Sequence, residues 1–259
     1  MNATNVTQDK LKGVILAGGL GTRLLPLTQN TNKHLIPIQG KPMITYPLET
    51  LIHSGIDEIL IVTDKKYAQA FQTQLEPYQS IAKITFAFQE KPLGPADALA
   101  KAQPFAQGSP ICVALGDNII QYDLEQEAKQ FLANPYGAKI LLKHTDHPQY
   151  YGIATLENQK IINITEKPKH PLSNHAVIGY YFYDISIFDL CQTIDPNNGV
   201  NDAFQITDIN NAYIQRRQMQ YAHYQGWWVD AGTAPAIAQV SDLLQMPIQN
   251  SIPENNAHD

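Results

Sequence analysis

A short apolar run that ends directly in a cluster of glycines is the feature that most constrains this fold. Residues 14–17, Val-Ile-Leu-Ala, have the composition of a strand that is buried on both faces. Gly18, Gly19 and Gly21 follow at once, and backbone amides at glycines can approach a phosphate closely because no Cβ stands in the way. The sequence therefore predicts a strand that leads into a phosphate-binding loop.

Two cations follow the glycines. Arg23 carries a planar guanidinium that matches phosphate oxygens, and Lys33 adds a mobile point charge. The glycine spacing differs from the dinucleotide-binding pattern Gly-x-Gly-x-x-Gly and from the P-loop, which ends in Gly-Lys-Ser/Thr. An ordinary glycine-rich turn is the alternative, but the two cations favour a phosphate site.

Strands and helices are predicted to alternate through the first half of the chain. Apolar β-branched runs predict strands, and apolar residues at helical spacing predict helices between them. The strands are expected at residues 13–17, 58–62, 84–88, 111–115 and 139–143, and the helices at 43–54, 66–75, 96–105 and 123–132. This alternation predicts an α/β fold with a doubly wound, mostly parallel sheet, which binds ligands at the carboxyl ends of its strands.

The second half has a different pattern. Alternating strands at 151–156, 161–166 and 177–183 are joined by turn-rich loops, which predicts an antiparallel layer added to the parallel sheet. Helical spacing returns at 206–216 and 235–244. No repeat or linker divides the chain, so we expect a disordered leader over 1–11, one domain over 12–246 and a polar tail over 247–259.

Composition argues against several classes of protein. With 44% hydrophobic and 16% charged residues, the 259-residue chain is typical of a globular domain. The net charge of −6 argues against a nucleic-acid partner, which usually requires a basic face. No apolar run is long enough to span a membrane, and residues 1–11 lack the apolar segment of a secretory signal. Cys112 and Cys191 have no metal-binding spacing and are predicted to be small buried hydrophobes. We therefore expect a cytoplasmic protein without membrane contact.

Two polar residues at strand ends are candidates for ligand contacts. Asp117 follows the apolar run 111–115 through Gly116, and a carboxylate in this position can bind Mg²⁺. A helix cap or a turn is the alternative for Asp117. Gln89 ends another strand, and its amide offers a donor and an acceptor that match the imide edge of uracil or thymine. A solvated side chain is the alternative for Gln89.

These motifs resemble the signature of the sugar nucleotidyltransferases, in particular the glucose-1-phosphate thymidylyltransferases. The family pattern Gly-x-Gly-Thr-Arg-Leu-x-Pro-x-Thr corresponds to residues 19–28, Lys-x-Leu-x-Pro to 33–37 and Lys-Pro-Met to 41–43. Leu-Gly-Asp-Asn at 115–118, Glu-Lys-Pro at 166–168 and Trp-x-Asp-x-Gly-Thr at 228–233 match further family motifs. The resemblance implies an enzyme that joins a nucleoside triphosphate to a sugar 1-phosphate and releases pyrophosphate.

The resemblance also implies a set of site residues. Catalysis is expected from Arg23, Lys33, Asp117 and Lys167, with a Mg²⁺ ion held between Asp117 and Asp230. The nucleotide is expected to contact Leu16, Gly18, Gly19, Gly21, Thr22, Gln89 and Gly94. The sugar phosphate is expected to contact Asn118, Gly152, Glu166, Lys167 and Val177. Tyr180, Tyr181 and Tyr183 are expected to pack in the sheet rather than to touch ligand.

The chain departs from the family pattern in two places. The family usually carries Glu-Leu-Glu-Ile-Thr before a helix, whereas residues 203–207 read Ala-Phe-Gln-Ile-Thr, and Asp202 is a candidate to replace one lost acidic position. Many members also continue beyond the position of Leu244 with helices that build an effector site, so we expect no such site here and a homodimer.

Several alternatives stay open. An amino or otherwise modified hexose is the alternative to glucose 1-phosphate, and both dTTP and UTP are candidate nucleotides. A non-catalytic regulator that binds nucleotide sugars is the alternative from another class of protein. Such a regulator would be expected to have lost the glycine loop or a metal carboxylate, and both are present in this sequence.

Overall fold

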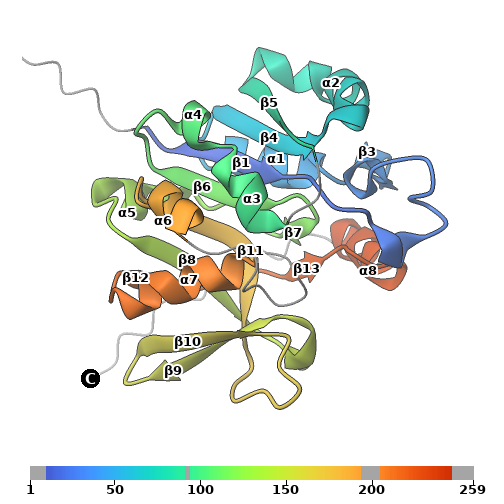
Figure 1. Cartoon of the computed structure of the whole chain (residues 1–259). Helices are drawn as coiled ribbons and strands as arrows, with labels where there is room; N and C mark the ends of the chain where they lie inside the picture. The colour runs from blue at the N-terminus through green and yellow to red at the C-terminus, as the bar shows by residue number, and fades with distance from the viewer. Residues whose placement is uncertain (1–9, 91–93, 194–204, 247–259) are drawn as a thin grey trace, which may run out of the picture.

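Four adjacent parallel strands form one side of a nine-stranded sheet, and the computed structural model describes the chain at residues 10–90, 94–193 and 205–246 (Figure 1). The parallel strands are β1 (Lys12–Leu16), β4 (Glu58–Asp64), β5 (Lys83–Gln89) and β6 (Ile111–Leu115). β1 pairs with β4 on one side and with β6 on the other, so the strand order reverses at β1. A crevice at such a reversal is where doubly wound sheets bind ligands.

The antiparallel part predicted from the second half continues this sheet beyond β6, and the strand at 139–143, expected among the parallel strands, pairs antiparallel here as well. β11 (His175–Tyr183) runs antiparallel to β6, and β8 (Ala138–His144) runs antiparallel to β11. The hairpin of β9 (Gly152–Glu157) and β10 (Lys160–Glu166) joins β11 through β9 and extends away from the parallel strands (Figure 1). β12 (Met219–His223) pairs with the outer side of β8. We did not predict β12, because this edge strand is only half-buried and carries a weak apolar pattern.

Two short ribbons lie beside the main sheet. β2 (Pro37–Ile38) pairs with β3 (Lys41–Pro42), and β7 (Asn118–Ile120) pairs antiparallel with β13 (Trp228–Asp230). The second ribbon aligns Asp230 with Asn118. This pairing brings two distant stretches of sequence together at the end of β6.

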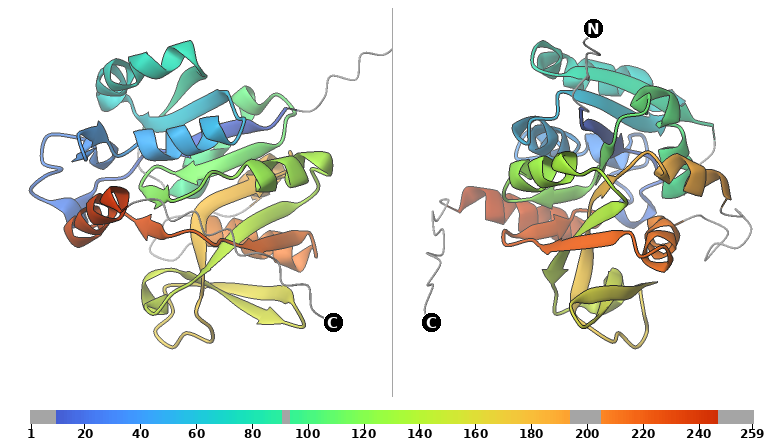
Figure 2. Two further views of the ribbon diagram at one scale, coloured as in Figure 1. Left: turned by 180° about the vertical axis from the view of Figure 1, so that it is seen from behind. Right: turned by 90° about the vertical axis from the view of Figure 1, so that its left-hand side faces the viewer.

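Helices cover both faces of the sheet (Figure 2). One face packs against α1 (Thr45–His53), α2 (Ala68–Leu75) and α5 (Glu125–Ala133). The other packs against α3 (Pro95–Ala100), α4 (Gln103–Ala106), α6 (Ile187–Thr193) and α7 (Ile206–Gln215). α8 (Ala234–Gln245) packs on the β7–β13 ribbon. Residues of β1 alternate between the two cores, which explains why the whole run is apolar.

Three boundaries differ from the sequence-based expectations. The predicted leader is too long, because Leu11 is buried and Lys10 forms an ion pair with Asp57. The predicted helix over 96–105 is divided into α3 and α4, and Pro104 lies in the first turn of α4, since a proline inside one continuous helix would clash with the preceding turn. The predicted helix over 66–75 begins as a 3₁₀ turn at Lys65–Tyr67. The predicted polar tail lies outside the described residues.

None of the helices described here is both long enough and apolar enough to span a bilayer. Both cysteines are free; Cys112 is buried and Cys191 partly buried. Burial raises the pKa of the Cys191 thiol to about 12, which agrees with the expectation of unreactive hydrophobes.

Gly137, at the start of β8, provides a test of this packing. Its φ of 73° is a left-handed conformation, and a Cβ there would lie 2.1 Å from the backbone oxygen of Gln218. Gly137→Ala should lower the free energy of unfolding by about 2 kcal/mol or more, measured by denaturant titration. Gly108→Ala is the matched control, because Gly108 has a φ of 87° but no atom within 4 Å of its Cβ position. Equal losses in the two variants would contradict the close approach of Gln218.

Candidate active site

The ends of β1 and β6 lie side by side and define the floor of the site. Leu16 pairs with Leu115, and the Gly116 amide donates to the Leu16 carbonyl at 3.0 Å. A Cβ on Gly116 would lie 2.7 Å from the ring of His34. Glycine at position 116 therefore lets His34 lie directly against the junction of the two strands.

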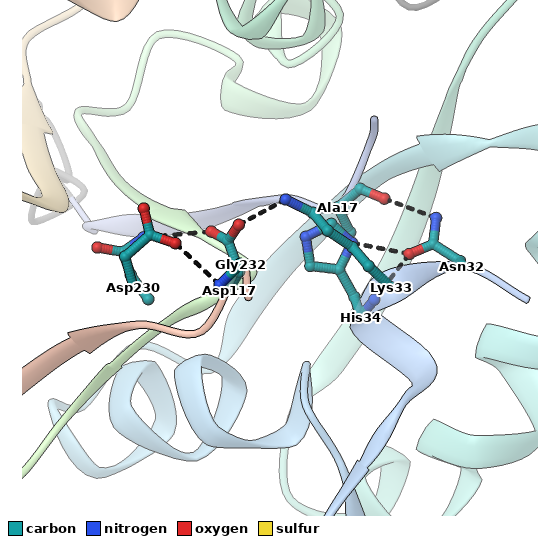
Figure 3. Close-up of polar contacts among 8 residues, drawn as sticks. Ala17, Asn32, Lys33, His34, Asp117, Asp230 and Gly232 are labelled. Carbon is teal, nitrogen blue, oxygen red and sulfur yellow. Dashed lines mark hydrogen bonds and ion pairs between the residues drawn. The ribbon is translucent and has the colours of Figure 1, made fainter. Parts of the chain in front are cut away.

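Asn32 fixes the segment that carries Lys33 and His34 (Figure 3). Its Nδ2 donates to the Ala17 carbonyl at 3.1 Å, so its Oδ1 faces the other way. This Oδ1 accepts from the backbone N of His34 at 2.9 Å and lies 2.8 Å from His34 Nδ1. The ring therefore carries its proton on Nδ1, and Nε2 keeps a lone pair.

His34 is neutral in the folded protein. It is 1% exposed and lines the cavity described below. Burial, together with the positive charge of Lys33, lowers the pKa of His34 to about 3. The site thus contains an uncharged imidazole beside a charged ammonium group.

Lys33 and Asp117 form a close ion pair. Lys33 Nζ lies 2.5 Å from Asp117 Oδ2 (Figure 3), and Asn118 Nδ2 donates to the other carboxylate oxygen at 3.2 Å. Burial alone would raise the pKa of Asp117, but the charge of Lys33 and these hydrogen bonds hold it below its usual value. Asp117 is therefore ionised at neutral pH although it is buried.

Asp230 lies close to Asp117 on the neighbouring ribbon. The Ala231 amide donates to the Asp117 carbonyl at 2.8 Å, and the Gly232 amide donates to Asp230 Oδ1 at 3.0 Å (Figure 3). Burial and the negative charge of Asp117 raise the pKa of Asp230, while Lys33 and Arg23 oppose the shift. Two carboxylates whose charges repel each other are a donor set that fits a divalent cation.

Arg23 approaches these carboxylates from the loop after β1. A Cβ on Gly232 would lie 2.7 Å from Arg23 Nη2 and 2.8 Å from Asp230 Oδ1, so the guanidinium and the carboxylate flank this glycine. Arg23 is otherwise exposed. Neither Arg23 nor the neighbouring Gly21 and Thr22 lines one of the two cavities described next.

The first cavity has a volume of about 270 Å³ and lies over the ends of β1 and β6. It brings together seven of the residues predicted for the nucleotide or for catalysis: Leu16, Gly18, Gly19, Lys33, Gln89, Gly94 and Asp117. Gln89 is 7% exposed, and its Nε2 donates to Asp97 at 2.9 Å. The alternative of a solvated Gln89 is therefore wrong.

The second cavity, of about 170 Å³, adjoins the first, because Pro95 and Leu115 line both. Its wall includes every residue predicted for the sugar phosphate, together with one predicted metal ligand: Asn118, Gly152, Glu166, Lys167, Val177 and Asp230. Asn118 is held by Trp228, whose Nε1 donates to Asn118 Oδ1 at 2.7 Å, and by the Gly179 amide at 2.9 Å. These bonds fix the side chain at the base of the cavity.

Thr207 and Gln205 complete the second cavity from α7. Thr207 Oγ1 donates to Glu166 Oε2 at 2.7 Å, and Lys167 Nζ lies 3.3 Å from Glu166 Oε1. Gln205 is the position where the family usually carries an acidic residue, and it lines this cavity. The expected replacement by Asp202 falls outside the described residues.

Sequence analysis missed several residues that line the cavities. His34 follows Lys33 without any local pattern that distinguishes it, and Thr207 is one of several polar residues in α7. Tyr180, Tyr181 and Tyr183 are buried in β11 as expected, and Tyr181 also lines the second cavity. The sequence points to this cavity only through matches to family positions, such as Glu-Lys-Pro at 166–168, Gly152 and Val177.

Comparison with known proteins agrees with this geometry. A family model described as nucleotidyl transferase matches residues 12–246. The chain belongs to the nucleotidyl transferase family. It is 36% identical over 239 residues to a glucose-1-phosphate thymidylyltransferase of Xanthomonas campestris, covering 90% of this chain and 80% of that one. It is 32% identical to the low-salt glycan biosynthesis nucleotidyltransferase Agl11 of Haloferax volcanii, with 90% and 66% covered.

Solved structures of this nucleotidyl transferase family show the same fold. A Bacillus anthracis protein assigned as a glucose-1-phosphate thymidylyltransferase, crystallised with sucrose, superposes with a TM-score of 0.85 at 38% identity, covering 90% of this chain and 94% of that one. A UDP-glucose pyrophosphorylase in complex with UDP-glucose superposes with a TM-score of 0.79 at 23% identity, covering 91% and 98%. The predicted family and the doubly wound α/β fold are confirmed.

Burial of neutral His34 predicts a pH dependence of stability. Below pH about 6.5 a histidine in the unfolded chain binds a proton, whereas His34 in the folded protein stays neutral until about pH 3. The folded protein should therefore lose about 2 kcal/mol of stability from this group as pH falls from 7.5 to 5. His34→Gln should show a correspondingly shallower decline in denaturant titrations, while His147→Gln, at an exposed loop position, should match the parent. An unchanged decline in His34→Gln would show that His34 is protonated in the folded protein.

Proposed function

We propose that this nucleotidyl transferase condenses dTTP or UTP with a hexose 1-phosphate, glucose 1-phosphate in the first instance, to give a nucleotide-diphospho-sugar and pyrophosphate. One observation carries the proposal. A cavity lined by part of the glycine loop adjoins a cavity lined by Asn118, Glu166 and Lys167, and Asp117 lines the first while Asp230 lines the second. The names of the relatives supply the substrates.

The reaction needs no covalent intermediate with the protein. A phosphate oxygen of the sugar 1-phosphate attacks the α-phosphorus of the nucleoside triphosphate in line. One P–O bond forms there, the bond to the β-phosphate breaks, and pyrophosphate leaves with the electron pair. Catalysis is then a matter of positioning the two phosphates and stabilising their negative charge.

The charged side chains lie in different parts of the site and would contact different phosphates. Lys33 lies in the nucleotide cavity beside Asp117 and would contact the triphosphate. Lys167 lies in the second cavity and would hold the phosphate of the sugar. Arg23 approaches from the glycine loop next to Asp230, where charge on the reacting phosphates would accumulate. Glu166, which accepts a bond from Thr207, has oxygens that can also accept hydroxyl groups of the sugar.

A Mg²⁺ ion fits the carboxylates of this site. Asp117 and Asp230 would be its protein ligands, in keeping with the preference of Mg²⁺ for one or two carboxylates plus phosphate oxygens and water. Among the described residues no group of three or more His, Cys, Asp or Glu side chains is arranged to hold a metal, so substrate oxygens would complete its coordination. When bound, such an ion neutralises charge on the reacting phosphates.

The sugar is the less defined substrate. Gln205 in the second cavity replaces an acidic residue of the family pattern with a neutral amide, which favours an amino or otherwise modified hexose as the alternative. A homodimer, a cytoplasmic location and the absence of a nucleic-acid partner belong to the same proposal. The homodimer rests on two-fold dimers being the commonest assembly. The absence of a nucleic-acid partner rests on the net charge of −6.

Pyrophosphate release, screened over several triphosphates and sugar 1-phosphates with Mg²⁺, tests the proposal. Release with dTTP or UTP and a hexose 1-phosphate is expected, and ATP and CTP should be poor substrates. Efficient use of ATP would overturn the assignment of the base. No release with any pair, despite nucleotide-sugar binding, would favour the non-catalytic regulator.

Removing a charge at the reacting phosphates should slow turnover without unfolding the protein. Arg23→Ala and Asp117→Asn should each lower kcat about a hundredfold or more, which corresponds to about 2.7 kcal/mol of transition-state stabilisation. Steady-state pyrophosphate release measures kcat, and circular dichroism checks folding. The matched controls are Arg217→Ala and Asp123→Asn, because both side chains lie outside the two cavities. Near-parental turnover of Arg23→Ala or Asp117→Asn would refute the role of that residue.

Metal removal should abolish the reaction. A chelator in excess is expected to stop pyrophosphate release, and added Mg²⁺ is expected to restore it. Asp230→Asn should raise the Mg²⁺ concentration for half-maximal rate about tenfold or more, because one of two carboxylate ligands is lost. A rate that does not respond to the chelator would rule out the proposed ion.

A further inference from the structure

The amide nitrogen of Gln89 has both of its hydrogens engaged. Nε2 donates to Asp97 Oδ2 at 2.9 Å and to the Gly94 carbonyl at 3.4 Å. A carboxylate has no hydrogen to donate, so only the NH₂ side of an amide can face it. The orientation of the Gln89 amide is therefore determined by its partners.

The amide oxygen of Gln89 is the atom left for a ligand. Oε1 lies on the side of Gly18, where a Cβ would come within 2.7 Å of it. Both residues line the first cavity. Within the described residues no donor forms a hydrogen bond to this oxygen. From the sequence we expect Gln89 to offer a ligand both a donor and an acceptor. In the structure only the acceptor, Oε1, is available, because Nε2 donates to Asp97 and to Gly94.

Asp97 does not use its side chain to cap the helix in which it lies. It is the third residue of α3, and no side-chain hydrogen bond caps the start of this helix at Gly94. A carboxylate in a first turn is commonly explained by the helix dipole. Here it is half-buried and points instead to the strand end that carries Gln89.

We propose that Asp97 is a specificity-determining residue, because it holds the Gln89 amide as a pure hydrogen-bond acceptor toward the nucleobase. The inference rests on the nucleotide site proposed above and specifies which bases that site accepts. Thymine and uracil present a ring N–H that Gln89 Oε1 can accept. Cytosine presents a bare ring nitrogen at the same position, so two lone pairs would face each other across a buried contact.

The discrimination follows from the cost of an unpaired buried polar group. A site built to accept one hydrogen rejects a base that lacks it, because neither lone pair then finds a donor. Without Asp97 only the longer bond to the Gly94 carbonyl, at 3.4 Å, would oppose a 180° rotation of the amide that presents its NH₂ group to the cavity. Such a rotated amide would pair with the bare nitrogen of cytosine, and the selectivity would fall.

Asp97→Asn is the direct test, since it keeps the shape of the side chain and adds a donor. The quantity measured is the ratio of kcat/KM for dTTP to that for dCTP, with the same sugar 1-phosphate and Mg²⁺. We expect this ratio to fall about tenfold or more. The matched control is Asp123→Asn, which removes one carboxylate at the exposed start of α5 and should leave the ratio unchanged.

A double exchange separates positioning from a merely structural role. In Asp97→Asn combined with Gln89→Glu, the new amide can donate to the new carboxylate, and the second oxygen of that carboxylate faces the cavity. The donor–acceptor order of the pair is reversed, but an acceptor again faces the base. The double variant should regain selectivity for dTTP over dCTP although its overall rate changes.

The outcomes distinguish this proposal from the proposed reaction. Equal losses for dTTP and dCTP in Asp97→Asn, or a double variant that stays unselective, would overturn the role of Asp97. Calorimetric binding of dTTP and dCTP gives the same ratio without turnover. A preference for dTTP that depends on Asp97, in a protein that releases no pyrophosphate, would support this inference and overturn the proposed reaction.

Discussion

The parallel pairing of β1 with β6, at the point where the strand order reverses, is the constraint on which the rest of the site depends. It places the glycine loop and Asp117 at neighbouring strand ends, because Leu16 and Leu115 are partners in the same register. Gly116 then allows His34 to pack against the junction, and Asn32 ties the following turn to the Ala17 carbonyl. Lys33 reaches Asp117 as a consequence of this packing, not through any proximity in sequence.

Charge balance explains why these groups can be buried together. An isolated carboxylate at the depth of Asp117 would be costly, and the ammonium of Lys33 compensates it directly. Among the residues that the structure describes, Asp230 accepts a hydrogen bond from the Gly232 amide but has no ion pair like that of Asp117, and its pKa is raised by burial and by Asp117. Two carboxylates that repel each other thus lie beside Lys33 and Arg23, and a divalent cation between the carboxylates can relieve that repulsion. Neutral His34 adds no further positive charge to the site.

Local sequence patterns were sufficient for the parallel half of the fold and for the nucleotide side of the site. Residues 14–17 are all apolar because alternate side chains enter opposite cores, and the glycines follow directly. The meeting of Asp230 with Asp117 depended on the pairing of two three-residue strands, which are too short to carry a periodic signal. The same holds for the hydrogen bond between Gln89 and Asp97, which joins a strand end to a helix start across residues with no shared pattern.

The two cavities differ in the same way. The first cavity draws on the segments at the ends of β1, β5 and β6, on the start of α3 and on Lys33 and His34. The second cavity takes its wall from the hairpin β9–β10, from β11, from α7 and from the β7–β13 ribbon. Its polar groups are oriented by tertiary contacts such as Thr207 to Glu166 and Trp228 to Asn118. A change in any of these elements can therefore reshape the second cavity while the strand ends that line the first stay in place, and one fold can carry differently shaped sites in this way.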